Sequence, residues 1–476
     1  MCLSNARALC LGFALCVAPV AIADEAIDYE RQVKPLLAER CYACHGALKQ
    51  ESQLRLDTAA AVIKGGASGP AVNPGQAGSS LIIERVTAID DRMPPEGEPL
   101  TRQQIEMLRR WIDQGSQAPD HERPQLDPRK HWAFQPPQVV ALGALNKKSI
   151  SDLEKNLIDA IVRRIHSQHG LVTAPVAPRH VLLRRVYIDL IGLPPTTEQL
   201  DEFLTDESPD AYERVVERLL ASPRYGERWG RHWMDVWRYA DWSGEVNNQV
   251  RGSPEHIWRW RDWIIESLNQ DVGYDQMVRD MLAADELAPH DQHRLRATGF
   301  LARNWYKFNR NVWLDDTIEH TTKAFLGLTF NCAKCHDHKY DPISQENYYQ
   351  LRAFFEPHDV RTDPLPGQSD GQKNGLVRVF DALPDKPTYL FHRGQEHHPD
   401  KTNPLSPRLP EVLGGKLVLH SVSYMADEQV VNSTGRRMAL ANWLTDRSNP
   451  LTARVAVNHI WRRHFGRPIV DGVTDF

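Results

Sequence analysis

Cys41-Tyr42-Ala43-Cys44-His45 is a C-x-x-C-H pattern, the attachment signature of a c-type haem. Its two thiols are spaced so that each can form a thioether bond to one vinyl group of the same porphyrin. The imidazole of His45 follows the second thiol directly and can ligate the haem iron. A local disulfide and half of a zinc site are the alternative interpretations. A second copy of the pattern, C-A-K-C-H at residues 332–336, favours haem over both.

The first 23 residues have the composition of a secretory signal peptide. Arg7 is the positive charge of a short n-region, residues 8–20 are apolar, and Ala21-Ile22-Ala23 forms an A-x-A cleavage site. We therefore expect a periplasmic or otherwise exported chain that starts at Asp24. An uncleaved anchor and a lipoprotein at Cys16 are the alternatives. No later apolar run is long enough for a stable membrane span in the mature chain.

Every cysteine of the expected mature chain lies in a C-x-x-C-H pattern. Three of the seven cysteines would leave with the signal, because they precede residue 24. A disulfide scaffold would distribute its cysteines differently, and bacterial haem attachment takes place outside the cytoplasm. We therefore predict haem c at the first pattern and a second haem c at the other, with His45 and His336 as iron ligands. The predicted attachment residues are Cys41, Cys44, Cys332 and Cys335.

Charge and composition exclude some partners. The chain has 476 residues, of which 41% are hydrophobic, and a formal net charge of −5. It carries no basic stripe of the kind that nucleic-acid binding requires. We expect redox proteins as partners; the sequence does not indicate the oligomeric state.

The pattern of apolar residues predicts a mainly α chain in several parts. We expect a cytochrome-c-like helical domain followed by a larger, mostly helical domain that contains the second C-x-x-C-H. A segment with short β-like runs at 376–380 and 416–421 comes next, and a last helical stretch follows. The expected boundaries are 24–116 for the first domain, 117–150 for a linker, 151–357 for the helical domain, 358–435 for the loop-rich segment and 436–476 for the start of a C-terminal module.

In the first domain, Val33 and Leu37 share a helical face with Cys41 and Cys44, so a helix should enter the haem site. The glycine-rich stretch at 64–80 is expected to be a surface loop. A capping box of Thr101 and Gln104 should begin the next helix.

Met93 is the predicted sixth iron ligand. It precedes Pro94 and Pro95, which disfavour helix and hold it on a loop. Met107 is the competing methionine, but it lies inside the helix after Thr101, where packing is the usual role. A water, a histidine or an open position are the other possibilities.

The larger domain should contain a series of helices. From Ser151 on, we expect Leu153, Leu157, Ile158, Ile161 and Ile165 to face inward from one helix that stops at Gly170. Further helices are expected at about 179–191, 197–205, 209–221, 223–240, 254–269, 274–282 and 315–326.

The whole chain resembles the planctomycete-type cytochrome c domain proteins. The resemblance is carried by C-Y-A-C-H-G, by M-P-P at 93–95, by C-A-K-C-H-D-H-K-Y-D-P-I-S-Q at 332–345, and by N-P-L-T-A-R-V at 449–455. It implies an exported protein with a small cytochrome module, a larger helical module of unknown function and an uncharacterised C-terminal module. Relatives continue beyond the position of residue 476, so the chain resembles a truncated product. The resemblance implies no particular reaction.

The second C-x-x-C-H offers no obvious sixth ligand. His338 is too close in sequence to reach the opposite face of a ring held by His336, while His232, His256 and His320 are possible. A Cys332–Cys335 disulfide, a metal site with His338 or Asp341, and a thioredoxin-like pair remain as alternatives. We favour haem, because the attachment machinery recognises little more than the motif itself.

Arg238, Asp241, Asp285 and Glu286 could form an acid/base set, but buried arginine–aspartate pairing explains them equally well, so no catalytic residue is predicted. The leading interpretation is an exported c-type cytochrome with one or two covalent haems that transfers electrons in the cell envelope. We favour an electron carrier over an enzyme. The alternatives are a haem-dependent oxidoreductase that acts on an external substrate, and an envelope binding or scaffold protein with an accessory cytochrome module.

Overall fold

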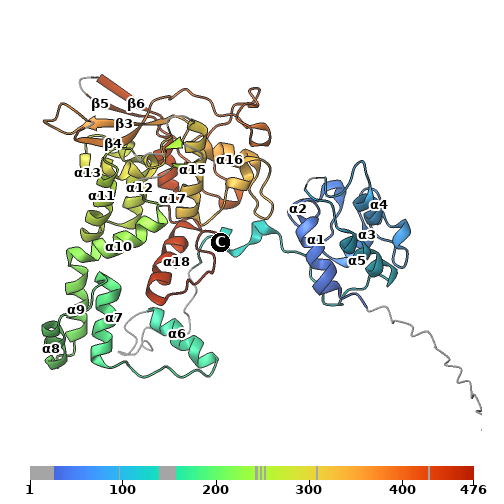
Figure 1. Ribbon diagram of the computed structural model, residues 1–476, viewed down its shortest axis with the longest axis horizontal. Coiled ribbons are helices and arrows are strands. Elements are labelled where there is room, and N and C mark those ends of the chain that lie inside the picture. The colour runs from blue at the N-terminus through green and yellow to red at the C-terminus, as the bar shows by residue number, and fades with distance from the viewer. Residues whose placement is uncertain are drawn as a thin grey trace, which may run out of the picture. The chain divides into compact units, whose positions relative to one another are not determined.

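A computed structural model describes residues 26–95, 97–138, 157–241, 245–246, 249–250, 254–306, 309–371, 373–426 and 429–476. The predicted signal and its cleavage site lie outside the described residues, as do Ser151 and Leu153. The chain divides into two compact units, Met1–Asp127 and Pro128–Phe476. Helices dominate both (Figure 1), which confirms the prediction of a mainly α chain. None of the described helices combines the length and the hydropathy that a membrane crossing requires.

The first unit is a small helical domain around one apolar core. Tyr29 and Trp111 stack in this core with ring centroids 5.3 Å apart. Met107 packs against the same core, as expected. The capping box is confirmed, because Thr101 Oγ1 accepts from the Gln104 N–H and Gln104 Oε1 accepts from the Thr101 N–H. The helices are η1 (Tyr29–Val33), α1 (Lys34–Arg40), α2 (Tyr42–His45), α3 (Ala59–Lys64), α4 (Leu81–Thr87) and α5 (Arg102–Asp113).

The segment after α5 is tied to the first unit by one buried carboxylate. Glu122 accepts hydrogen bonds from the Tyr29 hydroxyl at 2.7 Å, from Lys34 Nζ at 2.8 Å and from the Ala59 N–H at 2.9 Å. Burial and this carboxylate raise the pKa of Tyr29. The expected linker, 117–150, is therefore packed against the first unit in its opening part. Further along it, Phe134 is buried in the core of the second unit. Residues 139–150 lie outside the described residues.

The second unit is built mostly from helices. In Figure 1, α7, α8 and α9 lie at one end of it and the strands β3–β6 at the other. Its helices are α6 (Leu157–Gln168), α7 (Arg179–Ile191), α8 (Thr197–Thr205), α9 (Ala211–Leu220), α10 (Pro223–Val236), α11 (Trp258–Asn269), α12 (Tyr274–Leu287), α13 (Gln292–Leu295), α14 (Gly299–Ala302), α15 (Arg310–Thr321), η7 (Thr322–Leu326), η8 (Asn331–Lys334), α16 (Gln345–Arg352), α17 (Arg436–Leu444) and α18 (Thr452–Phe465).

The strands form antiparallel pairs: β1 (Glu245–Val246) with β2 (Gln249–Val250), β3 (His358–Pro364) with β4 (Gly375–Asp381), and β5 (Val422–Ala426) with β6 (Gln429–Ser433). The β-like run at 376–380 is therefore confirmed as β4. The run at 416–421 is not a strand. A strand needs a partner for its backbone groups, and the β5–β6 hairpin provides that pairing only from Val422 on.

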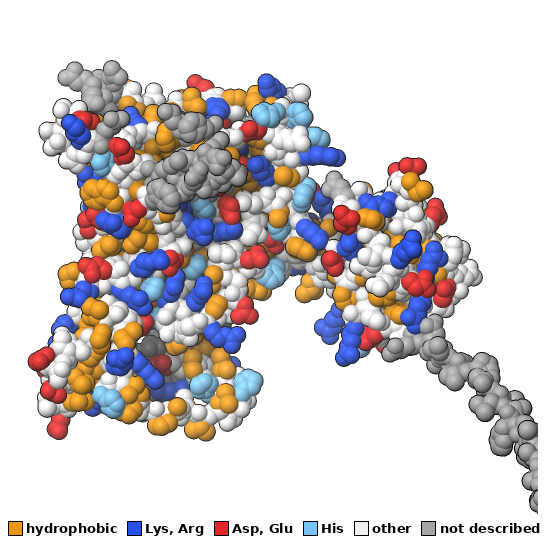
Figure 2. Space-filling view, viewed as in Figure 1, with side chains coloured by type: hydrophobic (Ala, Val, Ile, Leu, Met, Phe, Trp, Pro, Cys, Tyr) orange, Lys and Arg blue, Asp and Glu red, His pale blue; other side chains and the backbone are white. Residues whose placement is uncertain are grey.

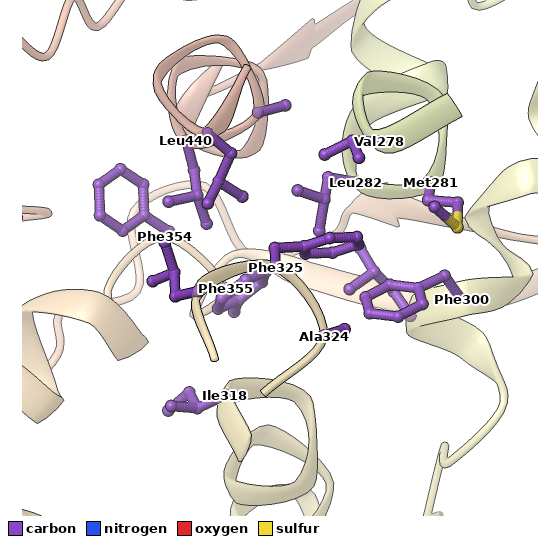
Figure 3. Packing of buried hydrophobic residues seen from close by; sticks show 14 of the residues in the cluster. Val278, Met281, Leu282, Phe300, Ile318, Ala324, Phe325, Phe354, Phe355 and Leu440 are labelled. Carbon is purple, nitrogen blue, oxygen red and sulfur yellow. The ribbon is translucent and has the colours of Figure 1, made fainter. Parts of the chain in front are cut away.

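One apolar core joins elements that are far apart in sequence. Figure 3 shows Leu282 of α12, Phe300 of α14, Phe325 of η7 and Leu440 of α17 close together. All four side chains are buried, and the rings of Phe300 and Phe325 have centroids 5.3 Å apart. The helices after residue 435 thus share a core with those of the preceding region.

The prediction that α6 buries its apolar face is wrong. Leu157, Ile158, Ile161 and Ile165 are 42–57% exposed, and Ala160 is the buried residue of this helix. Hydrophobic side chains lie at the surface in this part of the second unit (Figure 2). Periodicity predicts an apolar face, but burial of that face requires a second element to cover it, and no described element does so here.

Candidate haem sites

The first C-x-x-C-H lines a cavity inside the first unit. This cavity has a volume of about 290 Å³. Apolar side chains from several elements form much of its wall. Its lining includes Cys41, Cys44, His45, Leu54, Leu56, Ala71, Ile82, Val86, Met93, Pro94 and Pro95.

A break in the helix shapes the motif. The expected continuous helix is interrupted at Cys41, whose φ of −126° separates α1 from α2. Val33 and Leu37 are buried as predicted, whereas Cys41 is half-buried. The N–H groups of Cys44 and His45 both donate to the Cys41 carbonyl, at 3.2 and 2.9 Å. This single turn places the two thiols and the imidazole on the wall of the same cavity.

The two thiols of this motif are not joined in a disulfide, and neither cysteine is fully buried. Burial raises the pKa of the Cys41 thiol to about 12, so the thiol stays protonated at neutral pH. Covalent attachment to a vinyl group requires thiols that are partly accessible and not held in a disulfide.

The ring of His45 contains an unsatisfied atom. Its Nδ1 is buried and has no hydrogen-bond partner among the described residues. A buried polar atom without a partner costs about 1–3 kcal/mol. Two thiols, an imidazole with an open nitrogen and a thioether in a largely apolar cavity are a donor set that fits a covalently bound haem.

Met93 reaches the cavity from a loop that α4 holds in place. Its N–H donates to the Arg85 carbonyl at 2.9 Å. The side chain lines the cavity and is 38% exposed. Met107 does not line it. Of the two methionines considered from the sequence, Met93 is therefore the one near the cysteines.

The glycine-rich stretch at 64–80 does more than form a surface loop. Gly66 and Gly69 line the cavity and face each other in an antiparallel bridge. A Cβ atom on Gly66 would lie 2.5 Å from the Ser52 carbonyl oxygen, so a larger residue does not fit. Sequence reasoning missed this role, although a run of glycines is the usual signal for close approach of a backbone.

The second C-x-x-C-H lies on the surface of the second unit. Cys332 and Cys335 are exposed and not joined to each other. Lys334, between them, pairs with Asp315 of α15 at 2.6 Å, and its carbonyl accepts from the Tyr349 hydroxyl at 3.1 Å. The ring nitrogen Nδ1 of His336 lies 2.7 Å from the Asp337 carbonyl oxygen. The turn is thus fixed to its neighbouring helices while its thiols face solvent.

The residues that follow the second motif form a structural loop. His338 is buried, and its Nδ1 accepts from the Asp341 N–H at 2.9 Å. Its own N–H donates to the Ile343 carbonyl at 2.8 Å. Burial raises the pKa of the Asp341 carboxyl. His338 therefore closes this loop, and its Nδ1 is engaged within the loop.

The histidines suggested as a sixth ligand at the second motif lie in other environments. Burial, together with Arg303, lowers the pKa of His320 to about 2, and burial with Arg463 lowers that of His232 to about 4. His320 and His232 line two cavities to which neither Cys332 nor Cys335 contributes. Among the described residues, no three His, Cys, Asp or Glu side chains are grouped so that they could hold a metal ion.

The four residues weighed as an acid/base set are not assembled. Arg238 and Asp241 are exposed, whereas Asp285 and Glu286 are buried elsewhere. The partner of this buried pair is Arg437 of α17, which sequence reasoning missed. Arg437 makes two bonds to Asp285, at 2.6 and 2.7 Å, and lies 3.1 Å from Asp381 and 3.3 Å from Glu286.

This cluster predicts a pH dependence of stability. Burial raises the pKa of Glu286 from its usual 4.5 to about 7, although Arg437 opposes the shift. A carboxyl with a raised pKa binds more protons in the folded state, so its stabilisation is present below about pH 4.5 and is lost as pH rises to about 7. Glu286→Gln mimics the neutral form. Relative to wild type, it should therefore gain roughly 2 kcal/mol of unfolding free energy between about pH 5 and about pH 8.

Urea unfolding at both pH values measures this gain. The quantity compared is the change in unfolding free energy between the two pH values. Replacing a carboxylate oxygen by an amide costs the same free energy at both, so that cost cancels. Glu411→Gln, at a carboxyl in a short exposed turn, serves as the control. An equal pH dependence in wild type and Glu286→Gln would contradict the prediction.

Family comparisons cover the chain in three parts. Planctomycete cytochrome C matches residues 41–97, which include the first motif and Met93. A family described as a protein of unknown function (DUF1549) matches residues 157–360, which include the second motif. A second such family (DUF1553) matches residues 436–476. No curated protein and no solved structure matches the chain.

Proposed function

Because this chain belongs to the planctomycete-type cytochrome c domain proteins, we propose that it is an exported c-type cytochrome that transfers electrons in the cell envelope. The observation that carries the proposal is the shared cavity in the first unit. Two thiols that are not joined in a disulfide, one imidazole and Met93 line it together. This donor set corresponds to covalent haem c with histidine and methionine ligands.

The residues of the first unit have distinct roles in this proposal. The thiols of Cys41 and Cys44 would hold the porphyrin through two thioether bonds, each made by addition of S–H to a vinyl group and so without a leaving group. His45 and Met93 would ligate the iron, and methionine–histidine ligation raises the reduction potential. Leu54, Ile82 and other apolar wall residues exclude water from the cavity. Haem c, when bound, supplies a one-electron redox centre.

A second haem at Cys332, Cys335 and His336 is part of the same proposal. The repeated motif supports it, and so does the exposure of both thiols, because the attachment machinery must reach them. Redox proteins of the envelope are the proposed partners.

Haem content tests the proposal directly. The full chain, expressed with periplasmic export and haem maturation, should retain two haems after denaturation, measured as pyridine haemochrome. It should also show a reversible one-electron couple in a redox titration. One haem would remove the second site from the proposal, and no covalent haem would overturn the cytochrome assignment.

Met93→Ala tests the sixth ligand. We expect the oxidised variant to lose the weak red absorption band of a methionine–iron bond and to show a lower reduction potential, while it keeps its covalent haem. Met107→Ala is the matched control, because this side chain packs in the core instead. A red band that survives in Met93→Ala would exclude Met93 as the ligand.

A further inference from the structure

A polar cavity in the second unit brings together cationic side chains from three parts of the chain. Its volume is about 260 Å³. It lies where α10, α15 with η7, and α18 converge. Its polar lining includes Asp235, Arg238, Glu319, His320, Lys323, His459, Arg462, Arg463 and Thr474.

The positive charges of this cavity outnumber the negative ones. Glu319 pairs with Lys323, and Asp235 pairs with Arg463 at 3.3 Å. Within the described part of the chain, neither Arg238 nor Arg462 forms an ion pair or a side-chain hydrogen bond. Their two guanidinium groups at the rim therefore lie beyond ion-pair distance of any described carboxylate, although the charge of Arg238 helps to lower the pKa of Glu319.

A buried histidine in the lining has an open nitrogen. His459 is 7% exposed, and its Nε2 has no hydrogen-bond partner among the described residues. Buried polar atoms normally have partners, because an unmade hydrogen bond is costly. In the tautomer with its proton on Nε2, this nitrogen would donate a hydrogen bond to an anion in the cavity.

A second histidine adds a donor. Asn304 Nδ2 lies 2.7 Å from His320 Nδ1. The amide donates, so Nδ1 is the accepting nitrogen and the proton of the neutral ring is on Nε2. Burial and nearby cations keep His320 neutral at physiological pH by lowering its pKa.

Arg238 has a backbone conformation that is uncommon for arginine. The residue follows α10 in a left-handed conformation, with φ of 60°. Glycine adopts this conformation at lower cost than arginine.

We propose that this cavity binds a small ligand through an oxyanion group, that is, a carboxylate, sulfate or phosphate. Arg238 and Arg462 supply the unpaired positive charge, and His459 and His320 supply ring N–H donors. This site is independent of the first haem. A carboxylate of a haem attached at Cys332 could fill the cavity in place of a diffusible ligand. Cys332 is close enough for this, because the neighbouring Asn331 donates a hydrogen bond to Glu319 of the cavity.

Isothermal titration of the full, haem-loaded chain with sodium sulfate and with sodium phosphate tests the proposal. Sodium chloride at matched ionic strength is the reference. We expect saturable binding with one site per chain for at least one of the two oxyanions. Arg462→Gln and Arg238→Gly should each weaken this binding at least fivefold. Both positions are exposed, so both variants should fold.

Arg467→Gln is the matched control, because Arg467 is exposed just beyond α18 and does not line the cavity. It should leave binding unchanged. An equal loss in Arg467→Gln would overturn the proposal by showing only a general charge effect, and so would the absence of saturable binding in every chain. A Cys332→Ser, Cys335→Ser variant separates the two sources. If this variant and wild type bind the oxyanion equally, the site takes a diffusible ligand. If only the variant binds, the site recognises an oxyanion, but in wild type a haem carboxylate already fills it.

Discussion

Serine at both Cys41 and Cys44 should abolish covalent haem attachment in the first unit. A serine hydroxyl does not form the thioether that the proposed attachment requires, so the expected loss is complete. The measurement is pyridine haemochrome after denaturation and removal of unbound haem. With both sites loaded in wild type, the double variant should fall from two haems per chain to one.

The corresponding pair at the second motif is the matched control. Cys332→Ser with Cys335→Ser should also leave one haem, and the haem that remains should keep the red methionine band that depends on Met93. Serine at all four positions should leave none. Unchanged haem content in the Cys41, Cys44 variant would contradict the assignment of the first cavity. Unchanged content in the Cys332, Cys335 variant would instead favour a disulfide or free thiols at the second motif.

Arg437→Met should destabilise the second unit by about 3–5 kcal/mol, because it leaves buried carboxylates without their cation. Arg437 is fully buried and contacts Asp285, Glu286 and Asp381. Loss of one partner from a buried ion pair costs far more than the net value of the intact pair. Urea unfolding followed by tryptophan fluorescence measures the change.

Arg447→Met is the control for this variant, because Arg447 is exposed shortly after α17. A surface substitution of this kind should change the unfolding free energy by less than about 0.5 kcal/mol. Haem retained at Cys41 and Cys44 should be the same in both variants, because Arg437 belongs to the other unit. A loss below about 1 kcal/mol in Arg437→Met would show that the cluster is not essential to the core.

Local signals accounted for much of the fold. The expected helices at 179–191 and 197–205 coincide with α7 and α8. The capping box at Thr101 was predicted because both of its hydrogen bonds join residues three positions apart. Such features depend on neighbouring residues alone, so a single sequence contains all the information that they require.

Features that depend on packing were missed or misread. The apolar face of α6 was expected to be buried, but Ile158 is 57% exposed. Periodicity records which side of a helix is apolar and not whether another element covers it. The interruption at Cys41 was also unexpected, because the apolar spacing of Val33, Leu37 and Cys41 is that of a continuous helix.

The sequence alone determined which donor groups the first site offers. C-x-x-C-H places two thiols and an imidazole within one helical turn, and Pro94 keeps Met93 out of a helix. These are consequences of covalent spacing and backbone sterics, which act over a few residues. Only the tertiary structure decided that Met93 and the glycines at 66 and 69 line the same cavity as the cysteines, and that Arg437 neutralises Asp285 from 152 positions away. Such contacts form when the apolar faces of distant elements are buried together, and that burial brings side chains close without regard to their separation along the chain.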